Sequence, residues 1–157
     1  TSGTKTFNLA GIQAAAIVFP DQELKGVYDR FWVNLDIHRN NAFSSVAMEA
    51  AYREGEEWLE QLLPYLSANF DYVVDYCRTR IPQIKTFAPD ATYLMWLDCR
   101  ALGLEQEELM RRLLNAHVKV NDGLFFGEGG RGFIRLNIGC PRAQLNAALE
   151  RMKDVLN

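Results

Sequence analysis

The sequence predicts a small α/β or α+β unit in which helices cover one side of a short sheet. Segments with helical and strand-like spacing of apolar residues follow one another in the order strand, helices, strand, helix, strand, strand, helix. Residues 132–138 alternate between two faces, with Ile134, Leu136 and Ile138 on the face opposite Arg135. The longest helical pattern runs over residues 58–77.

Residues 7–20 predict the first strand. The run ends in Ala-Ile-Val-Phe and is closed by Pro20 and Asp21, which act as a stop signal. The run is interrupted by Asn8 and Gln13 and is too short to span a bilayer as a helix, so neither a signal peptide nor a membrane helix is expected. We expect a buried edge strand belonging to something larger than the C-terminal unit, and the start at Thr1 without Met fits a fragment.

Three helices are expected next. Asp21 can cap the first, and the second, shorter one carries Ser44 near its start. The third should kink or break at Pro64, which lacks a backbone donor, and should end before Pro82. The apolar faces of the first two are formed by Leu24, Val27, Tyr28, Phe31 and Trp32, and by Phe43, Val46, Ala47 and Ala50.

The remaining chain predicts strands over residues 92–98, 117–121 and 132–138, with a helix after Gly103 and another that begins at Pro141. The first of these helices should carry Leu109, Met110, Leu113 and Leu114 on one side; the second, Leu145, Ala148, Leu149, Met152 and Val155. The glycine-rich residues 127–132 lack a P-loop lysine and a strand–helix context, so we interpret them as a flexible connection and not as a phosphate-binding loop.

Charge and cysteine content exclude several classes of function. The formal net charge is −3, and the Arg111-Arg112 pair lies among glutamates, so no nucleic-acid-binding face is expected. The three cysteines are widely spaced and predict neither a disulfide framework nor a zinc site; reduced thiols favour the cytoplasm. The two histidines, His38 and His117, stand alone, so no metal site is expected.

Two residues are candidates for chemistry. Lys5 lies among small hydroxyl residues, where Ser2 and Thr4 can donate hydrogen bonds to a phosphate. Arg135 lies opposite the apolar face of its strand, and its planar guanidinium suits bidentate binding of a carboxylate. By composition alone, an exposed lysine in a polar segment is the more common interpretation of Lys5, and a structural ion pair with Asp or Glu is the more common one of Arg135.

Several stretches together match a known pattern: Ser2-Gly-Thr-Lys-Thr-Phe-Asn-Leu-Ala-Gly-Ile12, Asn41-Ala-Phe-Ser, Ala50-Ala-Tyr, Trp58-Leu, Ala91-Thr-Tyr-Leu-Met-Trp-Leu-Asp98, and Gly132-Phe-Ile-Arg-Leu-Asn-Ile-Gly-Cys-Pro-Arg142. In this order and spacing, over essentially the whole chain, they resemble the fold-type-I pyridoxal-phosphate (PLP) enzymes related to class I/II aminotransferases. The branch they resemble is that of the cystathionine β-lyase-like C–S lyases.

The resemblance implies roles for three residues. Lys5 matches the family's catalytic Schiff-base lysine, Ser2 matches a hydroxyl that binds the PLP phosphate, and Arg135 matches the arginine that binds the substrate α-carboxylate. Many aminotransferases have a phosphate-binding arginine eight residues after the lysine. This chain has Gln13 there, which favours the lyase branch over a plain aminotransferase.

The resemblance also implies a domain organisation. Residues 1–35 would be a remnant of the large PLP-binding domain with a connecting helix, and residues 36–157 would be interdomain helices and the C-terminal small domain. The expected enzyme is a cytoplasmic, homodimeric PLP-dependent C–S lyase that acts on an amino acid, with no nucleic-acid or membrane partner. The alternatives are a class I/II aminotransferase and, more remotely, a non-catalytic regulatory interaction module. Other cofactor-binding residues of the family precede the lysine, so these 157 residues alone are expected to be inactive.

Overall fold

The structure is a computed structural model that describes residues 1–37 and 41–156, so His38 lies outside the described residues. The chain divides into two compact units, Thr1–Leu62 and Leu63–Asn157, referred to below as the N-terminal and C-terminal units. The two units are defined by the contacts within each of them, so their boundary does not test the predicted domains. The assignment of residues 1–35 to a large domain and of 36–157 to interdomain helices and a small domain stays a prediction.

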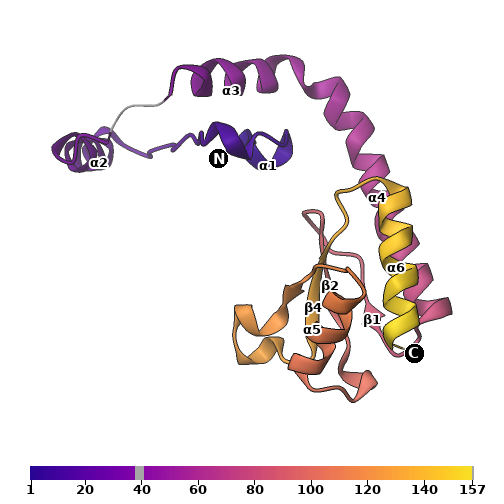
Figure 1. Cartoon of the computed structure of the whole chain (residues 1–157). Coiled ribbons are helices and arrows are strands. Elements are labelled where there is room, and N and C mark those ends of the chain that lie inside the picture. Colours follow the sequence, from indigo (N-terminus) through magenta and orange to yellow (C-terminus); the bar gives the residue numbers. More distant parts are fainter. Residues whose placement is uncertain (38–40, 157) are drawn as a thin grey trace. The chain divides into compact units, whose positions relative to one another are not determined.

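The C-terminal unit is built on an antiparallel four-stranded sheet with the order β1-β2-β4-β3 (Figure 1). Its strands are β1 (Lys85–Thr86), β2 (Leu94–Asp98), β3 (Asn121–Asp122) and β4 (Phe133–Asn137). Its helices are α5 (Gln106–Asn115), α6 (Arg142–Leu156) and the C-terminal part of α4 (Glu56–Arg80). The mixed helical and antiparallel architecture confirms the predicted fold class.

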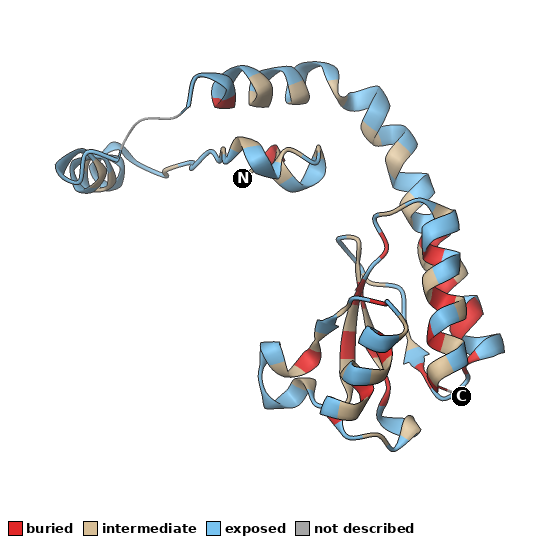
Figure 2. Ribbon diagram, in the orientation of Figure 1, coloured by how far each residue is buried: buried red, intermediate tan, exposed pale blue. Residues whose placement is uncertain are grey.

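One face of this sheet forms the core with the helices. Met95 and Leu97 of β2 and Ile134 and Leu136 of β4 are buried, as strand alternation requires. They contact buried side chains of all three helices, including Val73 and Cys77 of α4, Leu109 and Leu113 of α5, and Leu145, Leu149 and Met152 of α6. Figure 2 shows the buried residues concentrated on these elements. The predicted facing of Ile134, Leu136 and Ile138 is therefore confirmed.

Asn69 of α4 ties this helix to the connection between β4 and α6. Its Nδ2 donates to the carbonyl oxygens of Ile138 at 3.0 Å and Cys140 at 3.1 Å. Its Oδ1 accepts from Nε of Arg142 at 2.7 Å. Asn69 is fully buried, and these bonds satisfy both of its polar atoms.

The N-terminal unit contains α1 (Gly3–Thr6), the 3₁₀ turn η1 (Ala10–Ile12), α2 (Gln22–Asn34), α3 (Ala42–Glu54) and the first residues of α4. Gly3 allows α1 to lie close to α3, because a Cβ at this position would be 3.2 Å from Sδ of Met48 and 3.3 Å from Cε2 of Tyr52. The carbonyl oxygen of Ile12 accepts from Oγ of Ser44 at 2.9 Å and from Nδ2 of Asn41 at 3.0 Å. These contacts hold η1 against the start of α3.

The helix predictions are confirmed, including the cap of α2, where Asp21 accepts from the backbone of Leu24 at 2.7 Å. The final helix begins at Arg142, one residue later than the predicted start at Pro141. Of the predicted kink or break at Pro64, the break is wrong, because α4 runs without interruption from Glu56 to Arg80; the kink stays a prediction. The helix ends before Pro82, as predicted. Leu114 was expected on the buried side of α5 but is 67% exposed.

The predicted buried strand over residues 7–20 is wrong. The segment contains η1 and is otherwise irregular, and Val18 is 85% exposed. A strand requires a partner for its backbone groups, and in the described part of this unit the only such pairing joins Thr1 and Ala16, at 2.7 and 2.8 Å. The apolar run alone does not provide that partner.

The predicted strand over residues 117–121 is largely wrong, because β3 comprises only Asn121 and Asp122. Val118 and Val120 nevertheless contact the core, as their predicted common facing requires. Residues 127–132 connect β3 and β4 as expected, but not as a loosely packed loop. The turns η3 (Gly123–Phe126) and η4 (Glu128–Gly130) lie so close together that a Cβ on Gly130 would be 2.0 Å from the carbonyl oxygen of Gly123.

Candidate functional site

The lysine segment, residues 1–14, is organised around the hydroxyl of Ser2. Ser2 caps α1, where its Oγ accepts from the backbone nitrogen of Thr4 at 3.2 Å. The same Oγ donates to the carbonyl oxygen of Ala14 at 2.7 Å and lies 2.8 Å from Oγ1 of Thr4. Since Ser2 has a single hydroxyl proton, Thr4 must be the donor in the bond between the two hydroxyls. All the hydrogen-bonding capacity of Ser2 is therefore used within the segment.

Lys5 lies in the last turn of α1 and is exposed. Within residues 1–37 and 41–156, its amine has no hydrogen-bond or ion-pair partner. The backbone is held on both sides of Lys5, by the Ser2 cap and by the bonds from Phe7 to Gly3 and from Leu9 to Thr4. The segment thus presents a primary amine from an ordered turn, next to two hydroxyl groups.

The apolar part of the lysine segment is fixed by aromatic contacts. The ring of Phe7 lies edge-on to Tyr52 of α3 at 5.4 Å and is tilted against Trp58 at 6.1 Å between ring centroids. Gln13 lies at the end of η1 with φ of 54° and is exposed. The side chain of Gln13 is a neutral amide. At the corresponding position, many aminotransferases have a positively charged arginine.

Arg135 lies in β4 on the face of the sheet opposite the core. This face, which we call the arginine face, also carries Trp96 and Asp98 of β2 and Phe133 of β4, all of them half-buried. In the register of the sheet, Arg135 is opposite Trp96 on one side and Asn121 on the other. The alternation seen in the sequence therefore predicted the facing of Arg135 correctly.

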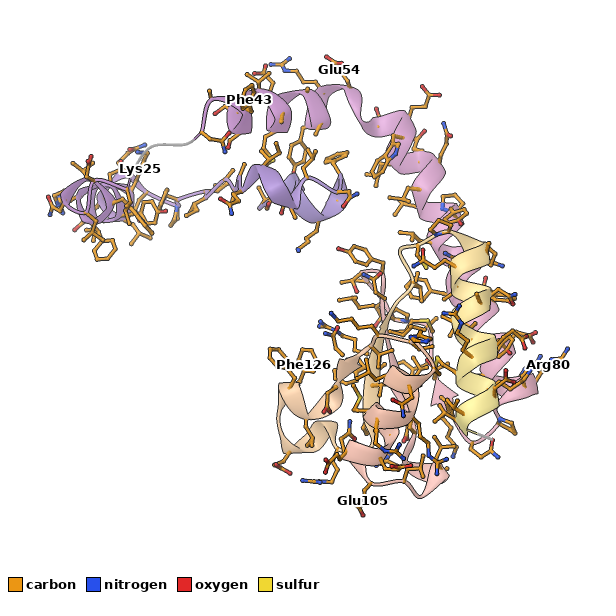
Figure 3. The ribbon with its side chains drawn as sticks, in the orientation of Figure 1. Lys25, Phe43, Glu54, Arg80, Glu105 and Phe126 are labelled. Carbon is orange, nitrogen blue, oxygen red and sulfur yellow. The ribbon has the colours of Figure 1, made fainter. Side chains whose placement is uncertain are left out.

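Neutral groups surround the guanidinium of Arg135. Oδ1 of Asn121 accepts from its Nη2 at 3.1 Å and from its Nε at 3.3 Å. The guanidinium carbon lies 4.4 Å from the ring centroid of Phe126, the aromatic residue labelled at the edge of the sheet in Figure 3. Among the described residues, no carboxylate forms an ion pair with Arg135.

A second arginine on this face is in the opposite situation. Arg100 donates from Nε and Nη2 to the two carboxylate oxygens of Asp98 at 2.9 and 2.7 Å, and its guanidinium carbon lies 4.8 Å from the ring centroid of Phe133. The hydrogen bond from Arg100 holds the pKa of Asp98 below its usual range. The charge of Arg100 is therefore compensated by Asp98, whereas that of Arg135 is not compensated by any described carboxylate.

The sequence did not identify Asn121 and Phe126 as functional candidates. Phe126 and Asn121 precede Arg135 by 9 and 14 positions, and only the register of β3 against β4 and the fold of η3 bring them to Arg135. Their place just before the glycine-rich residues 127–132 was the only available signal. Lys5 and Arg135 belong to different units, and each is described within its own unit.

Comparison with known proteins places this chain among PLP-dependent proteins, although no family model matches it. It is 40% identical over 155 residues to cystathionine beta-lyase PatB of Bacillus subtilis (strain 168), covering 98% of the chain and 40% of that protein. A PLP-bound structure from Clostridium difficile 630, assigned as an aminotransferase, gives a TM-score of 0.96 at 44% identity, over 99% of the chain and 41% of that protein. PLP-containing cystalysin from Treponema denticola gives a TM-score of 0.90 at 28% identity, over 99% of the chain and 40% of that protein.

The chain thus spans about two fifths of the length of the relatives that it matches. Further matches have the same character, including a cystathionine beta-lyase of Corynebacterium glutamicum at 36% identity over 162 residues, covering 99% of the chain and 41% of that protein. The match extends over the lysine segment and over the arginine face, since nearly the whole chain is covered. The chain belongs to the fold-type-I PLP enzymes, in the branch of the cystathionine β-lyases and related C–S lyases.

Proposed function

We propose that the intact protein containing this chain is a PLP-dependent C–S β-lyase, similar to cystathionine β-lyases. It would cleave a sulfur-containing amino acid, with uptake of one water, to a thiol, pyruvate and ammonia. The observation that carries the proposal is the 40% identity to the Bacillus subtilis cystathionine beta-lyase over 98% of the chain. Because the chain covers only 40% of that relative, the activity is proposed for the intact protein.

The lysine segment fits a cofactor that carries an aldehyde and a phosphate. The exposed amine of Lys5 is available for covalent attachment, and Ser2 can donate to a phosphate oxygen if that oxygen takes the hydrogen that Ala14 now accepts. Bound PLP supplies an electron sink for negative charge that develops on the substrate α-carbon. The amine of Lys5, when not attached to the cofactor, would remove the α-proton.

Arg135 is proposed to bind the α-carboxylate of the substrate. Its side chain is half-buried, its charge has no carboxylate partner among the described residues, and Asn121 occupies only the Nε–Nη2 edge of the guanidinium. The Nη1–Nη2 edge can therefore receive both oxygens of a carboxylate. Held in this way, the substrate would present its α-proton in a fixed direction.

The remaining features of the proposal follow from the family. Residues 1–35 would belong to the large cofactor-binding domain and residues 36–157 to the interdomain helices and the small domain. The intact protein would be a cytoplasmic homodimer that acts on a small amino-acid substrate. Every helix among the described residues is too short or too polar to cross a membrane.

The intact holoprotein should release pyruvate from cystathionine, as measured in a coupled lactate dehydrogenase assay. Lys5→Ala should abolish both turnover and cofactor that borohydride can trap on the protein. Arg135→Ala should lower kcat/KM by about 100-fold, since two charge-assisted hydrogen bonds are lost. The 157-residue chain alone should give no pyruvate and should hold PLP weakly or not at all.

A class I/II aminotransferase is the second candidate, and the 44% identity to the Clostridium difficile structure assigned as an aminotransferase favours it. The same assay decides between the two. Amino transfer from the substrate to a 2-oxo acid without pyruvate release would reject the lyase in favour of the aminotransferase. Trappable cofactor in Lys5→Ala would refute the role of Lys5, and an unchanged kcat/KM in Arg135→Ala would refute that of Arg135.

A further inference from the structure

The described groups that hold the guanidinium of Arg135 carry no charge. From β3, Asn121 offers a neutral amide oxygen at 3.1 Å from Nη2 and 3.3 Å from Nε of Arg135. From η3, the ring of Phe126 lies over the guanidinium at 4.4 Å. An aspartate at position 121 would be almost isosteric and would neutralise the arginine, so the amide at this position preserves the positive charge.

The ring of Phe126 is itself held in place. It lies edge-on to Trp96, the residue opposite Arg135 on β2, at 5.2 Å between ring centroids. The turn that carries it, η3, is capped by Asp122, whose Oδ1 accepts from the backbone nitrogen of Leu124 at 2.9 Å. The aromatic contact and the cap thus hold both the ring and the turn that carries it.

A buried glutamine on α5 stabilises the same turn through side-chain hydrogen bonds. Gln106 is 5% exposed; its Nε2 donates to Oδ1 of Asp122 at 2.6 Å and to the carbonyl oxygen of Phe133 at 3.2 Å. Its Oε1 accepts from the backbone nitrogen of Gly132 at 2.7 Å. Gln106 therefore joins β3, β4 and the connection between them, so that the position of Asn121 and Phe126 against Arg135 depends on a satisfied buried network.

We propose that Asn121 and Phe126 are positioning residues for Arg135, resting on the proposed function in which Arg135 binds the substrate α-carboxylate. Asn121 fixes the Nε–Nη2 edge without neutralising the guanidinium, and Phe126 covers one of its faces. The remaining Nη1–Nη2 edge is thereby presented to a carboxylate in one orientation and with its full charge. Specificity for substrates that carry an α-carboxylate then depends on the neutrality of residue 121 as well as on Arg135.

The decisive substitution is Asn121→Asp in the intact holoprotein. The new carboxylate would pair with Arg135 and compete with the ligand, whereas the shape of the residue is retained. Two non-reacting probes separate this effect from a general disturbance: 2-methylalanine, which has a carboxylate but no α-proton, and its amide, 2-methylalaninamide. Dissociation constants for both follow from the absorbance change of the bound cofactor.

Asn121→Asp is expected to raise the dissociation constant of 2-methylalanine by about tenfold or more, comparable to the loss of one charge-assisted hydrogen bond, and to change that of the amide by less than about twofold. Asn121→Gln keeps a neutral acceptor and should stay within about threefold of the wild type for both probes. Phe126→Leu should raise the dissociation constant of 2-methylalanine by a few-fold, because a cation–π contact is lost, and should leave that of the amide unchanged. Asn115→Asp, the same charge change at an exposed position on α5, is the matched control and should leave both constants unchanged.

Arg135→Ala, measured with the same probes, separates this inference from the function on which it rests. If it leaves 2-methylalanine binding unchanged, the carboxylate role of Arg135 is refuted and the positioning role falls with it. If Arg135→Ala weakens the binding of 2-methylalanine but Asn121→Asp does not, the positioning inference alone is overturned. Equal weakening of 2-methylalanine and its amide in Asn121→Asp would also overturn it, because a purely structural role would affect both probes.

Discussion

At the scale of single residues, the arginine face shows how the partner of an arginine decides its use. Arg100 is paired in a bidentate manner with Asp98, a geometry that compensates the charge. Arg135 has the same side chain but is held by an amide and an aromatic ring. Arg100 is therefore suited to a structural role and Arg135 to binding an anion.

The Asp98–Arg100 pair makes a contribution to stability that depends on pH. The folded-state pKa of Asp98 is lowered, chiefly by the hydrogen bond from Arg100, so the contribution is present above the unfolded-state pKa of about 3.9. It is lost as the pH falls through the lower, folded-state pKa. Asp98→Asn should therefore destabilise the chain modestly at pH 7, because the Arg100 side chain is 65% exposed and screened by solvent, and progressively less in acid.

Urea unfolding of the wild type and Asp98→Asn, followed by circular dichroism from pH 7 down to about pH 3, measures this difference. Glu128→Gln is the control, since Glu128 forms an ion pair with Arg131 but its side chain is 85% exposed. A difference between Asp98→Asn and the wild type that stays constant down to the lowest pH would contradict the assignment.

At the scale of elements, local signals predicted the helices and failed for two of the strands. The Asp21 cap of α2 and the apolar spacing of α2 and α6 are encoded within each segment and could be read from the sequence. The expected strands over residues 7–20 and 117–121 lacked the partner backbone that a strand requires. The facing of Arg135 is a local property of its strand, so alternation predicted it. The positions of Asn121 and Phe126 depend on strand pairing and turn geometry, which no local pattern encodes.

The connection between β3 and β4 illustrates this dependence on close approach. A Cβ on Gly130 would lie 2.0 Å from the carbonyl oxygen of Gly123, and that atom belongs to backbone which cannot rotate away. Gly130→Ala should destabilise the chain by about 1–3 kcal/mol through overpacking. Because η3 carries Phe126, the same change should also weaken carboxylate binding by the intact protein.

Gly129→Ala is the matched control, because a Cβ at position 129 has no atom within 4 Å and the residue lies in the same turn, η4. Urea unfolding of both variants gives the comparison. Equal stability of Gly130→Ala and Gly129→Ala would show that the two turns can separate without cost and would reject the close packing of η3 against η4.

At the scale of the whole molecule, the two units differ in how they bury apolar surface. The hydrophobic core identified in the chain lies in the C-terminal unit, where strands and helices contribute fully buried side chains such as Leu97, Ile134 and Leu149. Among the described residues of the N-terminal unit, only Gly3 and Ser44 are buried. Its large apolar side chains are instead exposed, among them Val18, Phe31, Phe43 and Val46. Burial of apolar surface is the main favourable term in folding, so the two units should differ in stability.

Hydrogen–deuterium exchange of the 157-residue chain, read by mass spectrometry of peptides, tests this difference. Amides of α2 and α3 should exchange at least about 100-fold faster than those of β2, β4 and α6, because local opening in the N-terminal unit exposes little additional apolar surface. Leu149→Ala should cost about 2–5 kcal/mol and accelerate exchange only in the C-terminal unit, since Leu149 is fully buried in that core. Comparable protection of α2 and β4, or acceleration of α2 by Leu149→Ala, would show instead that the units unfold as one and that burial within each does not set its stability.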